Sequence, residues 1–165
     1  EEDVEEVMKT GACAEVLGHF FSEDGQHLPN SVSARAMAPR FADLKKHRIG
    51  KVAIITCSDG YGAGGREDMK ELAPKMGIAI VADEVYGPKD TDMTAQLTKI
   101  KGTDAQAIVC WGTNPGPAVI ARNRGQLGIR TPLYMSSGVA SKKFIELSGP
   151  ENAEGILLPA GRLIL

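Results

Sequence analysis

Short apolar runs alternate with amphipathic stretches along most of the chain. The clearest run, Val52 to Cys57, is continuous and rich in β-branched residues, which predicts a strand buried on both faces, as in a parallel sheet. Apolar residues at helical spacing separate the runs. Further strands are predicted at Ile78–Tyr86, Ala107–Trp111, Leu133–Ser136 and Gly155–Pro159, and helices at Arg66–Met76, Met93–Lys101, Pro117–Leu127 and Lys142–Leu147.

This alternation of five strands with helices predicts the α/β class, as a three-layer α/β/α arrangement around a parallel sheet. The pattern is flavodoxin-like, or Rossmann-like, and favours the strand order 2-1-3-4-5. Before the first strand, apolar spacing predicts helices over Glu1–Phe21 and Ser31–Arg48. The composition of Ser22–Asn30 predicts a loop between them.

Length and charge narrow the class of protein. A chain of 165 residues is expected to form one domain with a substantial core. The formal net charge of −2 gives no electrostatic reason to expect a nucleic acid or an anionic membrane as partner. No apolar run approaches the roughly 20 residues of a membrane span. The chain opens with EEDVEE, without an initiator Met or a basic signal-peptide start, and we expect a processed chain or an excised fragment.

A polar stretch with four glycines, Gly60 to Gly65, follows the first strand and is predicted to be a turn. Ligands of open α/β sheets bind at the carboxyl ends of strands, so this turn is a candidate site. Its glycines fit the pattern GxGxxG, and Asp83 stands near the distance of a ribose partner. Ser58 and Asp59 intervene between the strand and the first glycine, unlike that fingerprint. A nucleotide-binding Rossmann-type domain of an oxidoreductase is therefore the alternative hypothesis.

Other reactive residues give little sign of chemistry. The three cysteines have neither metal nor redox spacing, and we expect Cys57 and Cys110 to be reduced and buried in neighbouring strands. The histidines form no ligand-like group, and no catalytic constellation can be argued from order and spacing. Trp111, at the end of the third strand, is expected to pack in the core. We therefore predict no metal, no cofactor and no catalytic residue.

Four stretches together resemble the second lobe of a type I periplasmic solute-binding protein, of the branched-chain amino-acid transporter class. They are KVAIITCSDGYG (51–62), GPKDTDMTAQLTKIKGTDAQAIV (87–109), QLGIRTP (126–132) and AEGILLPA (153–160). The second stretch is the most specific, because its acidic loop and following helix are hard to obtain by chance from βαβ units alone. The resemblance covers residues 31–165 as the ligand-binding lobe and leaves residues 1–30, the predicted N-terminal helix and loop, outside.

This resemblance implies a solute-binding component of an ABC transporter, periplasmic or otherwise extracytoplasmic, without enzymatic activity. Such a receptor binds a small solute, an amino acid or a carboxylic acid, in a cleft between two lobes and delivers it to permease subunits. A sensory use of the same lobe is an open alternative. Only one lobe is expected in this chain, so the isolated lobe is expected to form homo-oligomers through surfaces that the other lobe would cover.

The resemblance also implies ligand contacts from three turns. Tyr61 matches the family's cleft tyrosine, with a solvated turn tyrosine as the alternative. Thr113 and Asn114 lie where several relatives have an aromatic residue, and Ser137 lies where amino-acid binders have an acid that pairs with the ligand's ammonium. A hydroxyl cannot supply that charge, so a solute other than an α-amino acid is expected. We expect Tyr61, Asn114 and Ser137 to face one concavity at the same rim of the sheet.

Overall fold

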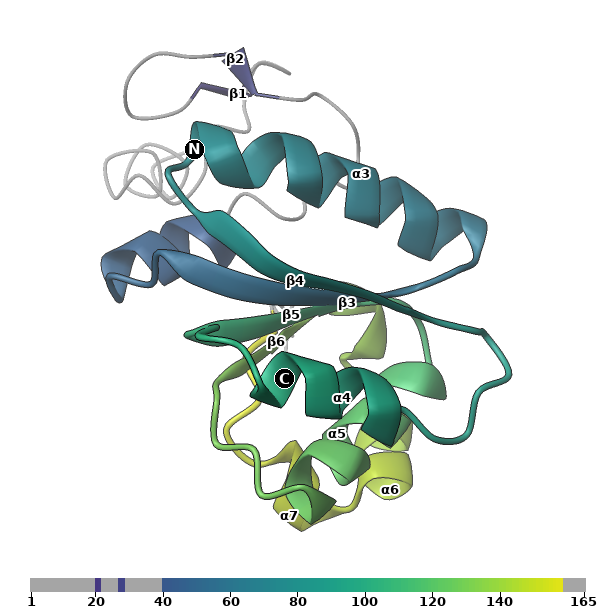
Figure 1. Cartoon of the computed structure of the whole chain (residues 1–165). Helices are drawn as coiled ribbons and strands as arrows, with labels where there is room; N and C mark the ends of the chain where they lie inside the picture. Colours follow the sequence, from purple (N-terminus) through teal and green to yellow (C-terminus); the bar gives the residue numbers. More distant parts are fainter. Residues whose placement is uncertain (1–19, 22–26, 29–39, 159–165) are drawn as a thin grey trace, which may run out of the picture.

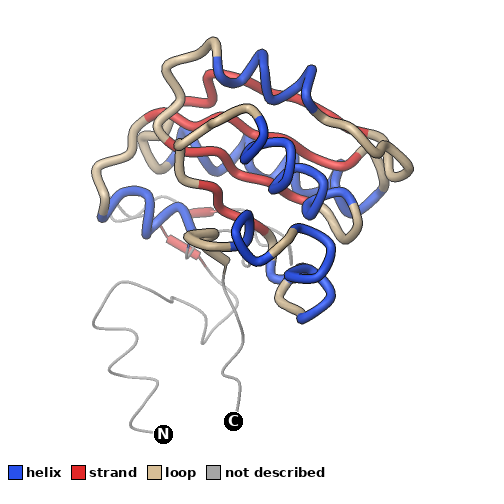
Figure 2. Tube along the Cα trace, turned by 90° about the horizontal axis from the view of Figure 1, so that it is seen from below, coloured by secondary structure: helices blue, strands red, loops and turns tan. Residues whose placement is uncertain are grey.

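The computed structural model describes residues 20–21, 27–28 and 40–158. Within them, four parallel strands form one sheet in the order β4-β3-β5-β6, and they lie side by side in Figure 2. This confirms the α/β class and the first four positions of the predicted order. The strands are β3 (Lys51–Cys57), β4 (Ala79–Tyr86), β5 (Ala107–Trp111) and β6 (Leu133–Met135).

Helices cover both faces of the sheet, as predicted (Figure 1). Helix α3 lies on one face, and α4 and α5 lie on the other (Figure 1). A helix over residues 40–46 packs on the same core as α3. The helices are α3 (Gly60–Lys75), α4 (Thr94–Lys101), α5 (Gly116–Gln126), α6 (Lys142–Ser148) and α7 (Pro150–Ala153), with a 3₁₀ turn η1 at Ser137–Val139.

Local signals explain where several helices begin and end. The carboxylate of Asp92, just before α4, accepts a hydrogen bond of 2.9 Å from the backbone N–H of Thr94, the first residue of the helix. Helix α5 has Pro117 in its first turn, where a missing N–H costs nothing. It is followed by Gly128, whose φ of 63° belongs to the left-handed region that favours glycine.

The sheet divides the apolar core into two clusters, because successive side chains of a strand point to opposite faces. From β3, Ala53, Ile55 and Cys57 pack with α4 and α5. Val52 and Ile54 pack on the other side with α3 and the helix over residues 40–46. All residues of β3 except Lys51 are buried, which confirms a strand covered on both faces.

The helix over residues 40–46 docks against strands that follow much later in the chain. Phe41 and Leu44 are fully buried and share a cluster with Tyr134 of β6. The Tyr134 hydroxyl donates to the Asp43 carboxylate at 3.0 Å. This confirms the part of the predicted second helix that is described.

The predicted fifth strand over Gly155–Pro159 is not formed in the described residues. Only a single parallel bridge joins Leu157 to Tyr134. The Leu157 N–H donates to the carbonyl of Leu133, and the Met135 N–H donates to the carbonyl of Leu157. Strand β6 is itself only three residues long, because Ser137 already belongs to a 3₁₀ turn, so a neighbour has little strand to pair with.

The beginning of the chain differs from the prediction where it is described. Phe20–Phe21 (β1) pairs antiparallel with His27–Leu28 (β2), where a helix end and a loop were predicted. Phenylalanine is favoured in strands. The helical spacing of apolar residues therefore predicted the wrong type of structure for Phe20–Phe21. The remainder of residues 1–39 and the proposed domain boundary after residue 30 lie outside the described residues.

The two described cysteines behave as predicted. Cys57 and Cys110 are free and buried in the adjacent strands β3 and β5. Burial raises the pKa of both thiols. They are therefore apolar packing groups rather than reactive thiolates.

Candidate functional site

The carboxyl ends of β3, β5 and β6 meet at one rim of the sheet. The chain leaves β3 into α3 on one face and leaves β5 into α5 on the other (Figure 1). The neighbouring strands β3 and β5 therefore mark the point where the strand order reverses. In open α/β sheets this position is where ligands bind.

The glycine-rich stretch after β3 is helix rather than turn, which corrects the prediction. Helix α3 begins at Gly60, and the side chain of Asp59 caps it by accepting a 2.7 Å hydrogen bond from the Gly62 N–H. Glycine has a low helix propensity, so its abundance here concealed the first turns of the helix.

Close packing explains two of these glycines. A Cβ on Gly62 would overlap the backbone carbonyl of Cys57, and a Cβ on Gly65 would overlap the indole of Trp111. Both glycines thus let α3 lie directly on the ends of β3 and β5. Packing alone therefore explains these two glycines, without a bound phosphate group.

The residue that the nucleotide hypothesis needs is already engaged. The carboxylate of Asp83 accepts two hydrogen bonds from the Arg66 guanidinium, at 2.6 and 2.7 Å, and lies 3.2 Å from the Lys70 ammonium. Burial raises the pKa of the Asp83 carboxyl, but these hydrogen bonds outweigh burial and leave the pKa below its usual value. Asp83 also lies in the middle of β4 rather than at its carboxyl end. The structure therefore offers the dinucleotide hypothesis no support.

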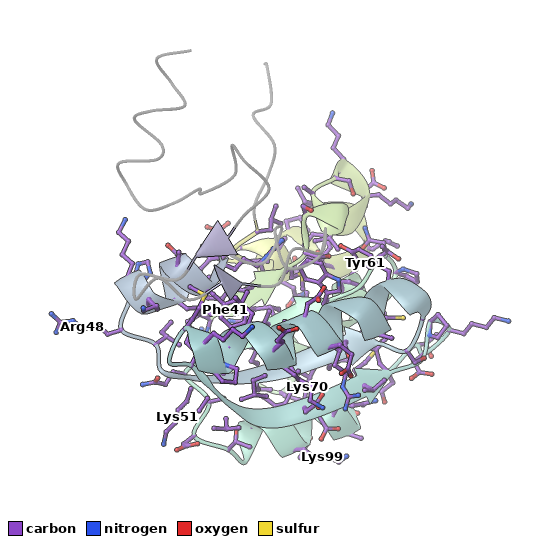
Figure 3. All side chains as sticks on the ribbon, turned by 90° about the horizontal axis from the view of Figure 1, so that it is seen from above. Phe41, Arg48, Lys51, Tyr61, Lys70 and Lys99 are labelled. Carbon is purple, nitrogen blue, oxygen red and sulfur yellow. The ribbon has the colours of Figure 1, made fainter. Side chains whose placement is uncertain are left out.

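Tyr61 is the second residue of α3 and lies at the rim. Its ring stacks on that of Trp111, with centroids 5.4 Å apart and an interplanar angle of 25°, and the residue is 40% exposed. Figure 3 shows Tyr61 at one end of the lobe and Arg48 and Lys51 at the opposite end. Trp111 is only 1% exposed, which confirms its predicted place in the core.

The turn after β5 holds Thr113 and Asn114. Thr113 is exposed, and Asn114 is half-buried and precedes Pro115 through a cis peptide bond. The side-chain oxygen of Asn114 is buried without a hydrogen-bond partner among the described residues. This turn therefore presents a hydroxyl to solvent and an amide whose acceptor is unsatisfied.

Ser137 begins the 3₁₀ turn after β6 and is exposed. The preceding Ser136 is buried, and its hydroxyl donates a 2.7 Å hydrogen bond to the carbonyl of Gly112. A Cβ on Gly138 would lie 3.7 Å from the Thr113 methyl group. The structure thus brings the turns after β5 and β6 together, with Tyr61 following the neighbouring strand β3.

Arg40 also belongs to this region and was missed by sequence reasoning. Its guanidinium carbon lies 5.0 Å from the Trp111 ring centroid, and its Nε donates 2.8 Å to the carbonyl of Met135. Burial lowers the pKa of Arg40 to about 10, so it is charged at neutral pH. No spacing in the sequence relates Arg40 to either partner, since both contacts form only on folding.

An open groove between α3 and β4 lies at the amino end of β4, away from the rim, and is lined by Lys70, Pro74, Gly77, Ile78, Ala79, Ile80 and Asp83. No cluster of three or more potential metal ligands occurs in the part of the chain that is described. None of the described helices has the length and apolar character needed to cross a bilayer.

A family model for periplasmic binding proteins matches residues 20–162. "Leu/Ile/Val-binding protein homolog 3" of Brucella melitensis is 27% identical over 114 residues, which are 69% of this chain and 31% of that protein. An "Amino acid binding protein" of Pseudomonas aeruginosa is 26% identical over 112 residues, 67% of this chain and 30% of that protein. The chain thus spans about a third of the length of these curated relatives.

Solved structures that superpose on this chain include proteins of the same class. Rp1789 of Rhodopseudomonas palustris superposes with a TM-score of 0.75 and 28% identity, covering 81% of this chain and 37% of that one. The branched-chain amino acid transporter substrate binding protein LivJ of Streptococcus pneumoniae, solved in complex with isoleucine, gives a TM-score of 0.64 and 28% identity, covering 74% and 35%. This family consists of solute receptors and not of enzymes. The chain therefore belongs to the type I periplasmic binding proteins, in the class of the branched-chain amino-acid receptors, and its sheet and helices correspond to one lobe of that fold.

Proposed function

We propose that this chain is one lobe of an extracytoplasmic solute receptor of an ABC transporter, which binds a small solute at the carboxyl rim of its sheet. One observation carries the proposal: Tyr61, Thr113, Asn114 and Ser137 all follow the carboxyl ends of the strands β3, β5 and β6. These turns adjoin the reversal of strand order, where α/β sheets bind ligands.

The solute lies in a cleft closed by a second lobe, supplied by the rest of a longer protein. The length of the curated relatives supports this, because the chain corresponds to about a third of each. The closed complex then presents the solute to permease subunits of the transporter. The lobe alone binds weakly, because water reaches every hydrogen bond until a second wall covers the ligand.

The receptor prefers a carboxylic acid to an α-amino acid. A buried ammonium needs a carboxylate partner, and Ser137 has only a hydroxyl where amino-acid receptors of the family carry an acid. The exposed hydroxyl of Thr113 and the unsatisfied oxygen of Asn114 add hydrogen-bonding groups, and the Tyr61 ring adds an apolar surface. A solute with a carboxylate and hydroxyl or carbonyl groups, including an aromatic acid, suits these side chains.

Calorimetry on the intact two-lobe protein tests this preference. Leucine, isoleucine and valine are titrated beside a panel of aliphatic and aromatic carboxylic acids. We expect an acid of the panel to bind at least about tenfold more tightly than leucine, a difference of about 1.4 kcal/mol. Micromolar or tighter binding of leucine contradicts the preference, because another residue would then supply the missing charge.

Ser137→Glu provides the matched variant, with Thr98→Glu as control. Glutamate at position 137 should raise the affinity for leucine and lower that for the acids, because it places a carboxylate beside the bound solute. Thr98 is exposed in α4 and lies outside the three turns of the candidate site. An unchanged affinity in Ser137→Glu would remove Ser137 from the site.

A further inference from the structure

Tyr61 owes its position to one buried side chain. Tyr61 lies at the start of α3, where a tyrosine can adopt several rotamers. The Trp111 indole provides the surface on which its ring stacks, at 5.4 Å and 25°. Such offset aromatic pairs are favourable beyond the area they bury. The rotamer of Tyr61 is therefore set by Trp111.

Trp111 is itself held on two sides. The indole fits against Gly65 of α3, where any Cβ would overlap it. The Arg40 guanidinium packs on the indole with its central carbon 5.0 Å from the ring centroid. Arg40 is 3% exposed, and a cation over an aromatic ring gains strength when both are removed from water.

Arg40 also joins Trp111 to the other two turns of the rim. Its Nε donates to the carbonyl of Met135, the last residue of β6. The next residue, Ser136, donates its hydroxyl to the carbonyl of Gly112 in the turn after β5. A continuous series of buried contacts thus runs from Tyr61 through Trp111 and Arg40 to both polar turns.

We propose that Arg40 and Trp111 are positioning residues that fix the Tyr61 ring and the turn after β6 relative to each other before the solute arrives. The inference rests on the proposed function only in treating these turns as the ligand site. A binding surface that is already ordered loses less conformational entropy on binding, so these two residues raise affinity without touching the solute.

The test compares Arg40→Met, Arg40→Lys and Trp111→Leu with the wild-type chain, and Arg122→Met serves as control. Methionine keeps much of the buried volume of Arg40, but it has no positive charge and cannot donate the hydrogen bond to the Met135 carbonyl. Arg122 is exposed in the second half of α5, away from the rim. Far-ultraviolet circular dichroism confirms that each variant folds.

Tryptophan fluorescence and tyrosine nitration both report on the stacking of Tyr61 and Trp111, and neither needs a ligand. Trp111 is the single tryptophan of the chain, so its emission describes this site alone. Of the three tyrosines, Tyr61 is exposed, whereas Tyr86 and Tyr134 are buried. The rate of mild nitration at Tyr61, followed by mass spectrometry, therefore measures how accessible its ring is. We expect Arg40→Met to increase acrylamide quenching of Trp111 and both Arg40→Met and Trp111→Leu to speed nitration of Tyr61. Arg40→Lys should restore part of the wild-type behaviour, and Arg122→Met should match wild type.

L-leucine and benzoate are then titrated as probes against the same proteins. For a probe that binds the wild type, we expect about a tenfold loss of affinity in Arg40→Met. Equal affinity in wild type and Arg40→Met overturns the positioning role and leaves the solute site standing. If neither probe binds, the nitration and quenching results alone decide, and wild-type values in folded Arg40→Met overturn the proposal.

Discussion

Two glycines in the first turns of α3, Gly64 and Gly65, differ in how much space surrounds them. Gly65 faces the Trp111 indole and has no room for a side chain, whereas the space around Gly64 is open to beyond 4 Å. Both lie in the same helix, and sequence alone does not distinguish them. Their different surroundings arise only from the packing of α3 on the end of β5.

Substituting these two glycines separates packing from helix propensity. Gly65→Ala should lower the free energy of unfolding by about 1 to 3 kcal/mol, because the methyl group displaces a buried indole. Gly64→Ala should raise it by about 0.5 kcal/mol, because alanine restricts the unfolded chain and favours the helix. Urea denaturation followed by circular dichroism measures both. A Gly65→Ala protein as stable as Gly64→Ala would show that the indole shifts freely.

At the same scale, local patterns predicted the positions of the candidate residues but not their contacts. Tyr61, Asn114 and Ser137 could be placed at strand ends because β3, β5 and β6 are apolar runs followed by polar residues. The packing of Tyr61 on Trp111 and the approach of Arg40 join residues far apart in sequence, and single-sequence periodicity carries no such information. Whether these residues touch a solute stays a prediction.

Among the elements, α3 and β4 are joined by a charged contact at the edge of the sheet. Arg66 and Lys70 of α3 both reach Asp83 of β4, whose side chain is 24% exposed. Charged side chains on an edge strand also discourage pairing with another chain. Tertiary contacts also decide where elements begin and end. Helix α3 packs on β5 and begins at Gly60 despite its high glycine content. Strand β6 is short, and the predicted fifth strand therefore forms only a single bridge to it.

Removing the carboxylate of Asp83 should alter the dependence of stability on pH. The pKa of Asp83 is lowered in the folded state, so its stabilising effect is present above the unfolded pKa of about 4 and is lost as pH falls through the folded pKa. Asp83→Asn should therefore lower the free energy of unfolding by about 1 kcal/mol at neutral pH. The difference from wild type should disappear in acid.

Denaturation at several pH values, with exposed Glu154→Gln as control, provides the measurement. The control should follow the wild-type curve throughout, because Glu154 lies beyond α7 and far from Asp83 in the chain. A constant difference between Asp83→Asn and wild type from pH 7 to acid would contradict the ionic origin of the effect.

For the whole molecule, the sheet has a buried centre and two edge strands among the described residues, the charged β4 and the short, apolar β6. Strand β3 is buried between its neighbours, whereas β6 has beyond it only the bridge to Leu157 in the described residues. Leu157 is 43% exposed. A short apolar edge of this kind is a place where another chain can add.

We predict that the isolated chain associates at high concentration through this edge and through surfaces that a second lobe would cover. Leu157→Lys should shift the chain toward monomer, because a charge at an edge opposes pairing. Ile145→Lys, at a similarly exposed position of 47% on α6, should not, since a helix has no unpaired strand edge to offer. Light scattering measures the difference. A wild-type chain that is monomeric at every concentration would contradict the prediction.

The docking of the helix over residues 40–46 has a consequence for the order of folding. Its contacts to β6, Arg40 with Met135 and Asp43 with Tyr134, join residues 95 and 91 positions apart. During synthesis this helix and its partners from β3 and α3 leave the ribosome before β6, so the contacts to Met135 and Tyr134 form only after β6 has been made. Closing so long a loop is entropically costly, and contacts of this separation form slowly. The final docking of this helix is therefore expected to wait for β6, although its neighbours in sequence are made first.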